Sequence, residues 1–309
     1  MRSETPVMKD QAHRGTIFVE DGEVVEQVAY PADQFIIRIR APRCAETARP
    51  GSFAHITCDP ELPMRRPLSI MGADPATGTV DFLYKIVGHG LALLAQREPG
   101  DSVSVLGPIG QPFRPDPTRP RALLIGGGVG IPPMVFLAER LAADPDTPWQ
   151  PLVLMGSEVP FPFELADAGQ HCHLPAGATG ALAALQAAGV PSRLASVAGL
   201  AGCFDGFVTD LAEAWLSGLG EKELAESALF ACGPTPMLAA TAKVAERFGL
   251  PCQVSLEEYM ACAVGGCAGC TVPVRTPDGV AMKRVCVDGP VFDAAAVFPV
   301  PDWANVSRS

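Results

Sequence analysis

The sequence predicts an α+β and α/β protein with three units: an antiparallel β-barrel, a parallel-sheet α/β domain and a small cysteine-rich unit. Three observations support this fold class. Short strand-like runs separated by turn residues fill the first third of the chain. Strands and helices then alternate, and cysteines gather toward the carboxyl end. We expect the units to span residues 12–115, 119–250 and 251–309.

The composition is that of an ordinary globular protein. The chain has 309 residues, of which 48% are hydrophobic and 18% are charged. At about 150 residues per domain, this length allows two domains and a small third one. The formal net charge of −11 disfavours binding to phosphate backbones or to anionic membranes. We therefore expect neither a nucleic acid nor a membrane as partner.

Hydropathy and the amino-terminal sequence predict a cytoplasmic protein. The uncharged stretch Ala122–Ala138 contains several glycines and two prolines, so it does not predict a bilayer span. The first ten residues, MRSETPVMKD, lack a basic region followed by an apolar core, so they predict no export signal. Disulfides are rare in the cytoplasm, which makes the placement of the ten cysteines informative.

The barrel is predicted from regularly spaced short strands with turn residues between them. The runs with strand character are residues 15–19, 35–40, 53–57, 80–85 and 102–106. One helix is expected, around residues 91–97. The proline-rich stretch 112–120 then predicts a linker.

After the linker, buried strands and amphipathic helices follow one another in the order typical of a parallel sheet. The first unit has strands at 121–125 and 151–155, with a helix at 133–143 between them. A later unit has a strand at 228–232 and a helix at 236–248. The segment 170–220 is rich in alanine and glycine, and its elements are not defined by the pattern.

Four cysteines have the spacing of a plant-type [2Fe–2S] site. Cys262, Cys267 and Cys270 form C-x4-C-x2-C, and Cys286 follows after fifteen residues. The residues between the first three are small, so a loop can wrap closely around a cluster and direct backbone N–H groups at its sulfurs. A structural zinc site is the alternative, although zinc sites usually pair two C-x2-C knuckles.

The other cysteines and the histidines are not expected to ligate metal. No histidine follows His173, which excludes a histidine-containing metal site in this region. Cys252 has no partner at a ligand spacing and is expected to be a buried thiol. The isolated cysteines, expected to be core or surface thiols, are Cys44, Cys58, Cys172 and Cys203.

Two turns at the ends of predicted strands are candidates for nucleotide binding. Gly127, Gly128 and Gly130 lie between a strand and a helix, where backbone N–H groups can bind a pyrophosphate. The turn departs from G-x-G-x-x-G because Pro133 occupies the third glycine position, so a plain connecting turn is the alternative. A second turn, at Cys232, Gly233 and Pro234, is expected at the same sheet edge, and the two together predict a ligand site.

Two segments of the predicted barrel are candidates for flavin binding. The first is Arg66, Pro67, Leu68 and Ser69, where an arginine and a hydroxyl can bind a pyrophosphate by charge-assisted hydrogen bonds. The alternative is that Arg65 and Arg66 form a solvated surface pair. The second comprises Leu83, Tyr84 and Lys85, which offer backbone groups and an aromatic face, and the turn at Gly90 and Leu91. The alternative there is an ordinary β-turn, with His89 a surface residue.

The order of these motifs resembles the ferredoxin–NADP reductase superfamily. Two further segments, Glu257–Cys262 and Arg284–Phe292, resemble the electron-transfer subunit of class B dihydroorotate dehydrogenase. The resemblance covers nearly the whole chain. It implies FAD at Arg66–Ser69, Leu83–Lys85, Gly90 and Leu91, NAD in the second domain, and a [2Fe–2S] cluster on the four cysteines.

The resemblance also implies a partner and a reaction. The partner is a separate FMN-containing catalytic subunit, with two copies of each chain in the complex. Electrons from dihydroorotate would pass through the partner's FMN, the cluster and FAD to NAD+ in pyrimidine biosynthesis. The chain itself has no catalytic acid–base residue, since it has no room for a (β/α)8 barrel of about 250 residues. Glu158, after the second predicted strand of the α/β domain, is expected to favour NAD over NADP.

Two departures from the family pattern and two rival functions remain. Leu91 stands where the family usually has a threonine, and residues 196–202 lack an acidic element expected before the match at 206–210. One rival is an NAD(P)H-dependent flavin and iron–sulfur reductase of another system, such as an oxygenase, a hydrogenase or a sulfur-reducing complex. The segment Arg284–Phe292 argues against it. The other rival is a zinc-stabilised regulatory protein that binds nucleotide without turnover.

Overall fold

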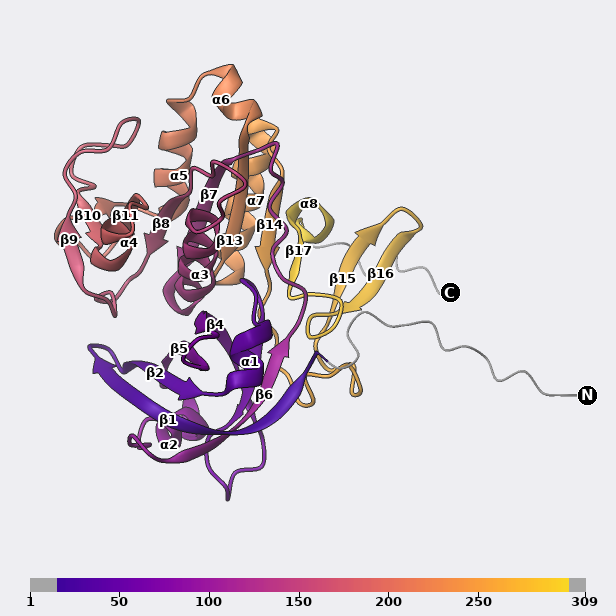
Figure 1. Cartoon of the computed structure of the whole chain (residues 1–309). Helices are drawn as coiled ribbons and strands as arrows, with labels where there is room; N and C mark the ends of the chain where they lie inside the picture. Colours follow the sequence, from indigo (N-terminus) through magenta and orange to yellow (C-terminus); the bar gives the residue numbers. More distant parts are fainter. Residues whose placement is uncertain (1–15, 300–309) are drawn as a thin grey trace, which may run out of the picture.

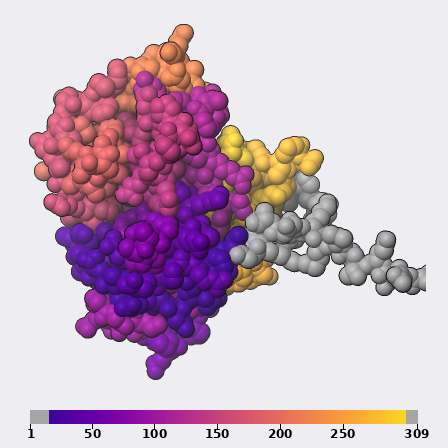
Figure 2. All heavy atoms as spheres, viewed as in Figure 1, coloured from indigo at the N-terminus to yellow at the C-terminus, as the bar shows by residue number. Residues whose placement is uncertain are grey.

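The computed structural model describes residues 16–299. A β-barrel is followed by an α/β domain with a parallel sheet, and a cysteine-rich segment lies beside both (Figure 1). The predicted fold class is confirmed. In the space-filling view the barrel and the α/β domain form one continuous body, with the cysteine-rich segment at its side (Figure 2).

Six antiparallel strands close the barrel in the order β1-β2-β5-β4-β3-β6. Alternation along each strand directs one set of side chains inward, so that Ile37, Ile39 and Val80 are fully buried. The strands are β1 (Phe18–Tyr30), β2 (Gln34–Arg40), β3 (Phe53–Thr57), β4 (Arg66–Asp74), β5 (Thr79–Lys85) and β6 (Ser102–Ile109). Two short helices, α1 (Pro42–Thr47) and α2 (Gly88–Leu94), accompany them.

Four of these strands match predicted runs. The run at 15–19 overlaps β1 only at Phe18 and Val19, and Gly15 lies outside the described residues. The strand β4 was not among the predicted runs. It contains Pro67 and Gly72, both disfavoured in strands, and its register with β5 shifts between Ile70 and Gly72. Arg66–Ser69 therefore form the first part of a barrel strand.

A seven-stranded sheet forms the α/β domain, in the order β12-β11-β8-β7-β13-β14-β17. All neighbours are parallel except β14 and β17. The strands are β7 (Arg121–Gly127), β8 (Leu152–Gly156), β11 (Ser192–Ser196), β12 (Phe204–Asp205), β13 (Ser227–Cys232), β14 (Cys252–Ser255) and β17 (Val291–Asp293). The helices are η1 (Gly128–Gly130), α3 (Ile131–Ala142), α4 (Ala183–Ala187), α5 (Val208–Ser217), α6 (Glu221–Ala225) and α7 (Thr235–Phe248).

Helices cover both faces of this sheet, which explains its apolar central strands. Leu123 and Ile125 of β7 pack with α5 and α7, whereas Ala122 and Leu124 pack with α3 and α4. The segment 170–220 contains β10 (Gly180–Leu182), α4, β11, β12 and α5. The strand β10 pairs with β9 (Leu165–Asp167) in a separate ribbon.

The cysteine-rich segment shares a sheet with the α/β domain. Its strands β14 and β17 extend that sheet across the predicted boundary at residue 250, and the exact domain limits stay a prediction. A hairpin of β15 (Thr271–Thr276) and β16 (Gly279–Arg284) projects from the body, and α8 (Ala294–Val297) follows β17 (Figure 1). Residues 300–309 of the predicted third unit and 12–15 of the first lie outside the described residues.

Two contacts hold the barrel against the rest of the molecule. Phe136 of α3 belongs to the apolar core of the barrel, and η1, at the carboxyl end of β7, lies against β5. A second apolar cluster joins Phe53 and Ile109 of the barrel to Cys270 and Cys286. The barrel therefore lies beside both the carboxyl edge of the sheet and the cysteine loop.

Candidate functional site

Arg66 and Gly90, predicted from two different segments, lie together. The Arg66 Nη1 donates hydrogen bonds to the carbonyls of Met64, at 2.7 Å, and Arg65, at 3.2 Å. A Cβ on Gly90 would lie 2.9 Å from the Arg66 Nε, so the missing side chain makes room for the guanidinium. Within residues 16–299 the hydrogen bonds of Arg66 go to main-chain carbonyls and not to a carboxylate, which leaves its charge available to an anion.

Arg65 has a structural role. Its guanidinium donates to the carbonyls of His55 and Ser104 at 3.0 and 2.9 Å, and to the Ser104 hydroxyl at 2.9 Å. These bonds fasten β3 to β6. The two adjacent arginines therefore differ, and they do not form a solvated pair.

Tyr84 corrects one expectation about the flavin segment. Its ring is 1% exposed, stacks on Phe35 with 5.5 Å between centroids, and its hydroxyl donates to Gln27 at 2.8 Å. The ring completes the barrel core, so it offers no aromatic face to a ligand. Leu83 is buried as well, and the segment can contribute backbone groups together with Lys85.

Leu91 stands where the family pattern has a threonine, and its side chain contributes to packing. It lies on α2 and packs against the apolar core of the barrel. A threonine there would add a hydroxyl at the cost of this apolar contact. The adjacent Gly90 is buried and lies against the Arg66 guanidinium. This turn can therefore donate hydrogen bonds to a ligand only from its backbone N–H groups.

The two predicted nucleotide turns touch each other. In the parallel register of β7 and β13, Gly126 lies opposite Cys232. A Cβ on Gly130 would lie 2.4 Å from the Cys232 carbonyl oxygen, and one on Gly127 would lie 2.5 Å from the Met237 sulfur. Only glycine allows this approach, so the predicted juxtaposition at one sheet edge is confirmed.

The tip of the first turn is open. Gly128 has φ +54° and no heavy atom within 4 Å of where its Cβ would be. It leads into α3, a helix of 12 residues that begins at Ile131 and has no backbone N–H at Pro132 or Pro133. The second turn, with Gly233 and Pro234, leads into α7. This arrangement places two helix N-termini beside the open tip.

Two other predicted segments lie along the same sheet edge. Glu158 is exposed just beyond β8, whose Gly156 pairs with Gly127. In the segment that departs from the family pattern, the Ser196 hydroxyl accepts from the Ala198 N–H at 3.1 Å. Asp210 accepts from the Phe207 N–H at 3.2 Å and so stabilises the start of α5.

The four predicted cysteines fall into two neighbouring pairs. The Cys262 sulfur accepts from the Cys267 N–H at 3.4 Å, and the Cys267 sulfur accepts from the Gly269 N–H at 3.4 Å. Burial raises the pKa of Cys262, but hydrogen bonds from the loop outweigh it and lower that pKa to about 7. Burial, then the neighbouring Cys270, raise the pKa of Cys286 to about 12.

This pairing matches the way in which a [2Fe–2S] cluster is held. A structural zinc ion requires four ligands around one point, whereas a [2Fe–2S] cluster takes two thiolates on each iron. The thiol arrangement and the inward N–H groups therefore fit an iron–sulfur cluster.

Backbone conformation and Arg284 hold the cysteine loop in place. Gly265 has φ +81°, and a Cβ there would lie 2.6 Å from a Val287 methyl carbon. The Arg284 guanidinium donates to the Gly265 carbonyl at 3.1 Å, and the Asp288 carboxylate accepts from the Arg284 N–H at 2.8 Å. The Val285 N–H donates to the Cys270 carbonyl at 2.9 Å. The fourth cysteine is thereby fastened to the loop with the other three.

The remaining cysteines lie elsewhere, and none of the ten forms a disulfide. Cys252 lies on β14 with 5% exposure, which confirms the predicted buried thiol. Cys44 and Cys58 are buried in the barrel, Cys172 is exposed, and Cys203 is half-buried.

The sequence pattern does not mark His55, which the structure places beside the flavin segment. It is an isolated histidine on β3, 1% exposed, and neither ring nitrogen has a hydrogen-bond partner among the described residues. No spacing rule distinguishes such a residue from an ordinary core histidine. Only the folded barrel shows which residues surround this histidine.

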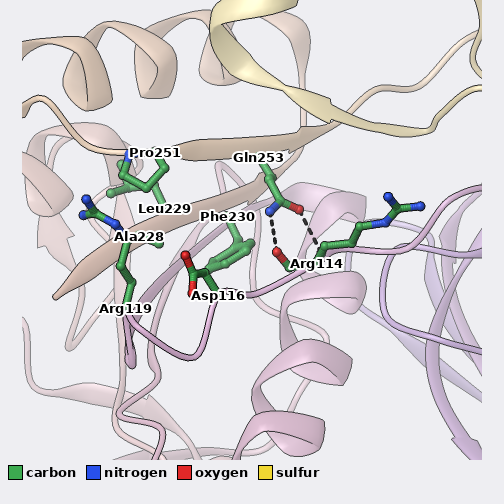
Figure 3. Close-up of a pocket in the computed structure, with 8 residues that line it drawn as sticks. All are labelled: Arg114, Asp116, Arg119, Ala228, Leu229, Phe230, Pro251 and Gln253. Atoms are coloured by element: carbon green, nitrogen blue, oxygen red, sulfur yellow. Dashed lines mark hydrogen bonds between the residues drawn. The ribbon is translucent and has the colours of Figure 1, made fainter.

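A cavity of about 320 Å³ lies away from these sites (Figure 3). It is lined by the linker residues Arg114, Asp116 and Arg119 and by the first halves of β13 and β14. Gln253 closes one side through two hydrogen bonds to the main chain of Arg114, at 2.9 and 2.7 Å. None of the predicted site residues lines it.

Within residues 16–299, no helix is long and apolar enough to cross a membrane.

Comparisons with known proteins support the assignment of the cysteine loop as an iron–sulfur site and the assignment of the fold. Residues 257–298 match the model of the iron–sulfur cluster binding domain of dihydroorotate dehydrogenase B. One structural neighbour, the NADH-dependent reduced ferredoxin–NADP oxidoreductase, has a TM-score of 0.72 and 27% identity, covering 90% of this chain and 89% of its own. A ferredoxin reductase of carbazole 1,9a-dioxygenase shares the fold, with a TM-score of 0.57 and 23% identity, covering 76% and 67%.

Two curated relatives extend the likeness over most of the sequence. The electron transfer subunit of dihydroorotate dehydrogenase B (NAD(+)) from Bacillus caldolyticus is 38% identical, covering 82% of this chain and 88% of the relative. The same subunit from Geobacillus thermodenitrificans is 36% identical, covering 89% and 96%. This chain therefore belongs to the family of dihydroorotate dehydrogenase B electron transfer subunits.

Proposed function

We propose that this chain is the electron-transfer subunit of an NAD+-dependent dihydroorotate dehydrogenase of pyrimidine biosynthesis. It would pass electrons from a partner subunit that oxidises dihydroorotate to NAD+. The main structural support is that one apolar cluster joins the barrel to the cysteine loop, while the glycine turns of the sheet edge lie against the same barrel. Three candidate cofactor sites are thereby neighbours in one chain.

FAD fits the barrel site around Arg66. The unneutralised guanidinium suits a pyrophosphate, Ser69 offers a hydroxyl on the same strand, and Gly90 keeps the space beside the arginine clear. Leu83, Tyr84 and Lys85, with Gly90 and Leu91, would contribute main-chain groups. When bound, FAD exchanges a hydride with a nicotinamide and single electrons with an iron–sulfur cluster.

NAD fits the sheet edge where the two turns meet. Gly128 would present the open tip of the first turn, Gly127 and Gly130 allow the second turn to approach, and Cys232, Gly233 and Pro234 would form the other side. The exposed carboxylate of Glu158 can accept a hydrogen bond from a ribose hydroxyl and repels a 2′-phosphate. We therefore propose NAD as the preferred nucleotide.

The four cysteines would hold the [2Fe–2S] cluster. Cys262 and Cys267 would ligate one iron, with Cys270 and Cys286 on the other, as their pairing suggests. Loop N–H groups directed at the sulfurs stabilise negative charge there.

The partner would be an FMN-containing catalytic subunit, with two copies of each chain in the complex. The named relatives are electron transfer subunits, and a chain with this role requires a second protein to oxidise the substrate. We also propose a cytoplasmic location, which agrees with ten cysteines and no disulfide.

A second candidate is the reductase subunit of another flavin and iron–sulfur system. The likeness to the NADH-dependent reduced ferredoxin–NADP oxidoreductase favours it, since that structure covers 90% of the chain. The two candidates differ in the electron donor and not in the cofactors expected.

Co-expression with the FMN subunit encoded in the same genome tests the proposal. We expect the anaerobically purified pair to contain FAD, FMN, two irons and two sulfides per pair of chains, and to reduce NAD+ with dihydroorotate. Isolated chains that carry FAD and iron but give no dihydroorotate-dependent activity with that subunit would favour the second candidate. Stoichiometric zinc without sulfide would overturn both.

A further inference from the structure

Phe136 packs outside the domain to which its helix belongs. Its side chain is 2% exposed and lies in the apolar cluster of the barrel, together with Ile70 of β4 and Phe82 of β5. The apolar residues of α3 that pack in the α/β domain instead are Ile131, Met134, Val135, Leu137, Ala138 and Leu141. The helix therefore has two apolar faces, and the barrel covers the one that carries Phe136.

Two charged residues lie one turn after Phe136, on the same face of α3. The Arg140 guanidinium donates to the Ala73 carbonyl of β4 at 3.4 Å. Burial, followed by the charge of Asp81 on β5, raises the pKa of Glu139, so a like charge lies near this carboxylate. A long hydrogen bond and a pair of like charges add little attraction. Phe136 therefore supplies most of the attraction on this face.

The helix α3 also carries the first nucleotide turn. The turn Gly128–Gly130 runs directly into Ile131, and it lies against β5 of the barrel. The strand β4, which pairs with β5, carries Arg66 and Ser69 of the proposed FAD segment. A helix is hydrogen-bonded along its length and moves as a unit. The contact at Phe136 therefore sets where the nucleotide turn lies relative to the FAD segment.

This relation matters for the proposed reaction, in which a hydride passes between the nicotinamide and the flavin with both electrons and one proton. The reacting atoms must approach to about 3–3.5 Å, and a misplacement of about 1 Å can slow a reaction about 100-fold. Neither Arg66 nor the glycine turn can correct such a shift, because each belongs to a different domain.

We propose that Phe136 is a positioning residue for hydride transfer between bound NAD and FAD, and that it acts by holding α3 and the first nucleotide turn against the barrel. This inference rests on the function proposed above. Phe136 lies within α3 and outside both proposed cofactor segments, so its effect should fall on the rate of transfer and not on the affinity for either cofactor.

The test follows the loss of flavin absorption when the anaerobically purified complex is mixed with excess NADH. We expect Phe136→Ala to slow the reduction of FAD about 10- to 100-fold. FAD content and the Kd for NAD+ should stay near the wild-type values. Phe136→Leu, which keeps an apolar side chain in the barrel, is expected to restore most of the rate.

Leu137→Ala is the matched control. Leu137 is also 2% exposed on α3, but it packs in the α/β domain. Its truncation should lower stability as Phe136→Ala does, yet leave the rate of FAD reduction unchanged. Hydrogen exchange supplies a readout independent of activity: the amides of β4 should exchange faster in Phe136→Ala than in Leu137→Ala.

A wild-type rate of FAD reduction in Phe136→Ala would overturn the inference. Equal slowing in Phe136→Ala and Leu137→Ala would overturn it as well, since the effect would then follow from the stability of α3 alone. If Phe136→Ala does not fold, Phe136→Val is compared with Leu137→Val. Wild-type protein that binds no FAD, or whose FAD is not reduced by NADH, would instead overturn the proposed function.

Discussion

Arg66 and Gly90 make a prediction at the scale of single residues. We expect Arg66→Ala to weaken FAD binding about 10- to 100-fold, because a charge-assisted hydrogen bond contributes roughly 1.5–3 kcal/mol. Gly90→Ala should weaken it as well, since the new Cβ would lie 2.9 Å from the Arg66 Nε and displace the guanidinium. Flavin retained after dialysis measures both effects.

Gly72→Ala is the control for this pair of variants. Gly72 lies on the same strand as Arg66, and a Cβ there would meet nothing closer than an Asp81 oxygen at 3.9 Å. Its flavin content should equal that of the wild type. Full flavin retention in Arg66→Ala would show that the pyrophosphate lies elsewhere.

His55 also predicts how stability depends on pH. Its pKa is lowered from 6.5 to about 4 in the folded protein by burial and by the charges of Arg65 and Arg66. The unfolded chain therefore binds a proton in this range that the folded chain does not, and stability falls as the pH drops from about 6.5 toward 4. We expect this residue to cost roughly 1 kcal/mol between pH 7 and pH 5.5.

Urea denaturation of the purified protein at the two pH values measures this effect. His55→Gln removes the titrating group, so its loss of stability between pH 7 and pH 5.5 should be smaller by that amount. Equal losses in the two proteins would mean that His55 takes up its proton in the folded state.

At the scale of residues, the sequence predicts which residues form the candidate sites better than it predicts which side chains are exposed. The pairing of Arg66 with Gly90 and the contact of Gly130 with Cys232 join residues that had been singled out separately. The residue type of Tyr84 predicts an aromatic face for a ligand, but its ring fills the barrel core beside Phe35. Whether a side chain faces inward depends on the closure of the barrel, which the local sequence does not encode.

Among the elements, the cysteine loop gives the most decisive test. We expect Cys267→Ser to abolish the cluster, since the thiolate is one of the four proposed ligands. Cys252→Ser, on β14 and 5% exposed, should leave the iron content unchanged. Iron and acid-labile sulfide analysis of the anaerobically purified variants measures both. Retention of two irons in Cys267→Ser would remove Cys267 from the ligand set.

The end of β8 predicts nucleotide choice. The exposed Glu158 follows this strand at the same edge as the glycine turns, and its carboxylate repels a 2′-phosphate. We expect kcat/KM to be higher with NADH than with NADPH, and Glu158→Gln to reduce that preference. Steady-state kinetics with a dye acceptor measures both values. Equal efficiency of the wild type with the two nucleotides would rule out this role.

Strands with a continuous apolar run are predicted from the sequence, whereas strands with an interrupted run are not. The apolar runs of β7, β8 and β13 are buried on both faces, which is why they stand out in the sequence. The strand β4 was missed because Pro67 and Gly72 interrupt its pattern. The carboxyl-terminal segment was expected to be separate, yet β14 joins β13 in register from Cys252 onward. The pairing of strands that are distant in sequence depends on tertiary contacts, which the periodicity of apolar residues within one segment does not show.

At the scale of the whole molecule, the cysteine loop exposes apolar side chains. Tyr259 is 95% exposed and Val264 is 49% exposed, and both lie within a few residues of Cys262. The loop residues around the cysteines are small, so a docked protein could come close to the cluster. Exposed apolar side chains beside a redox centre suit a protein–protein contact.

This exposure predicts that a charge at Val264 separates two activities. We expect Val264→Glu to leave NADH oxidation by a dye acceptor intact, because Arg66, Gly90 and the glycine turns lie on other elements. The same variant should lose most dihydroorotate-dependent NAD+ reduction with the proposed FMN subunit present, since a carboxylate would be buried without a partner if this loop forms the interface. Val28→Glu is the matched control and should retain both activities. The Val28 side chain lies on β1 and is 36% exposed. Native mass spectrometry of the co-expressed chains shows whether the complex forms. An intact complex with full coupled activity in Val264→Glu would move the docking surface away from this loop.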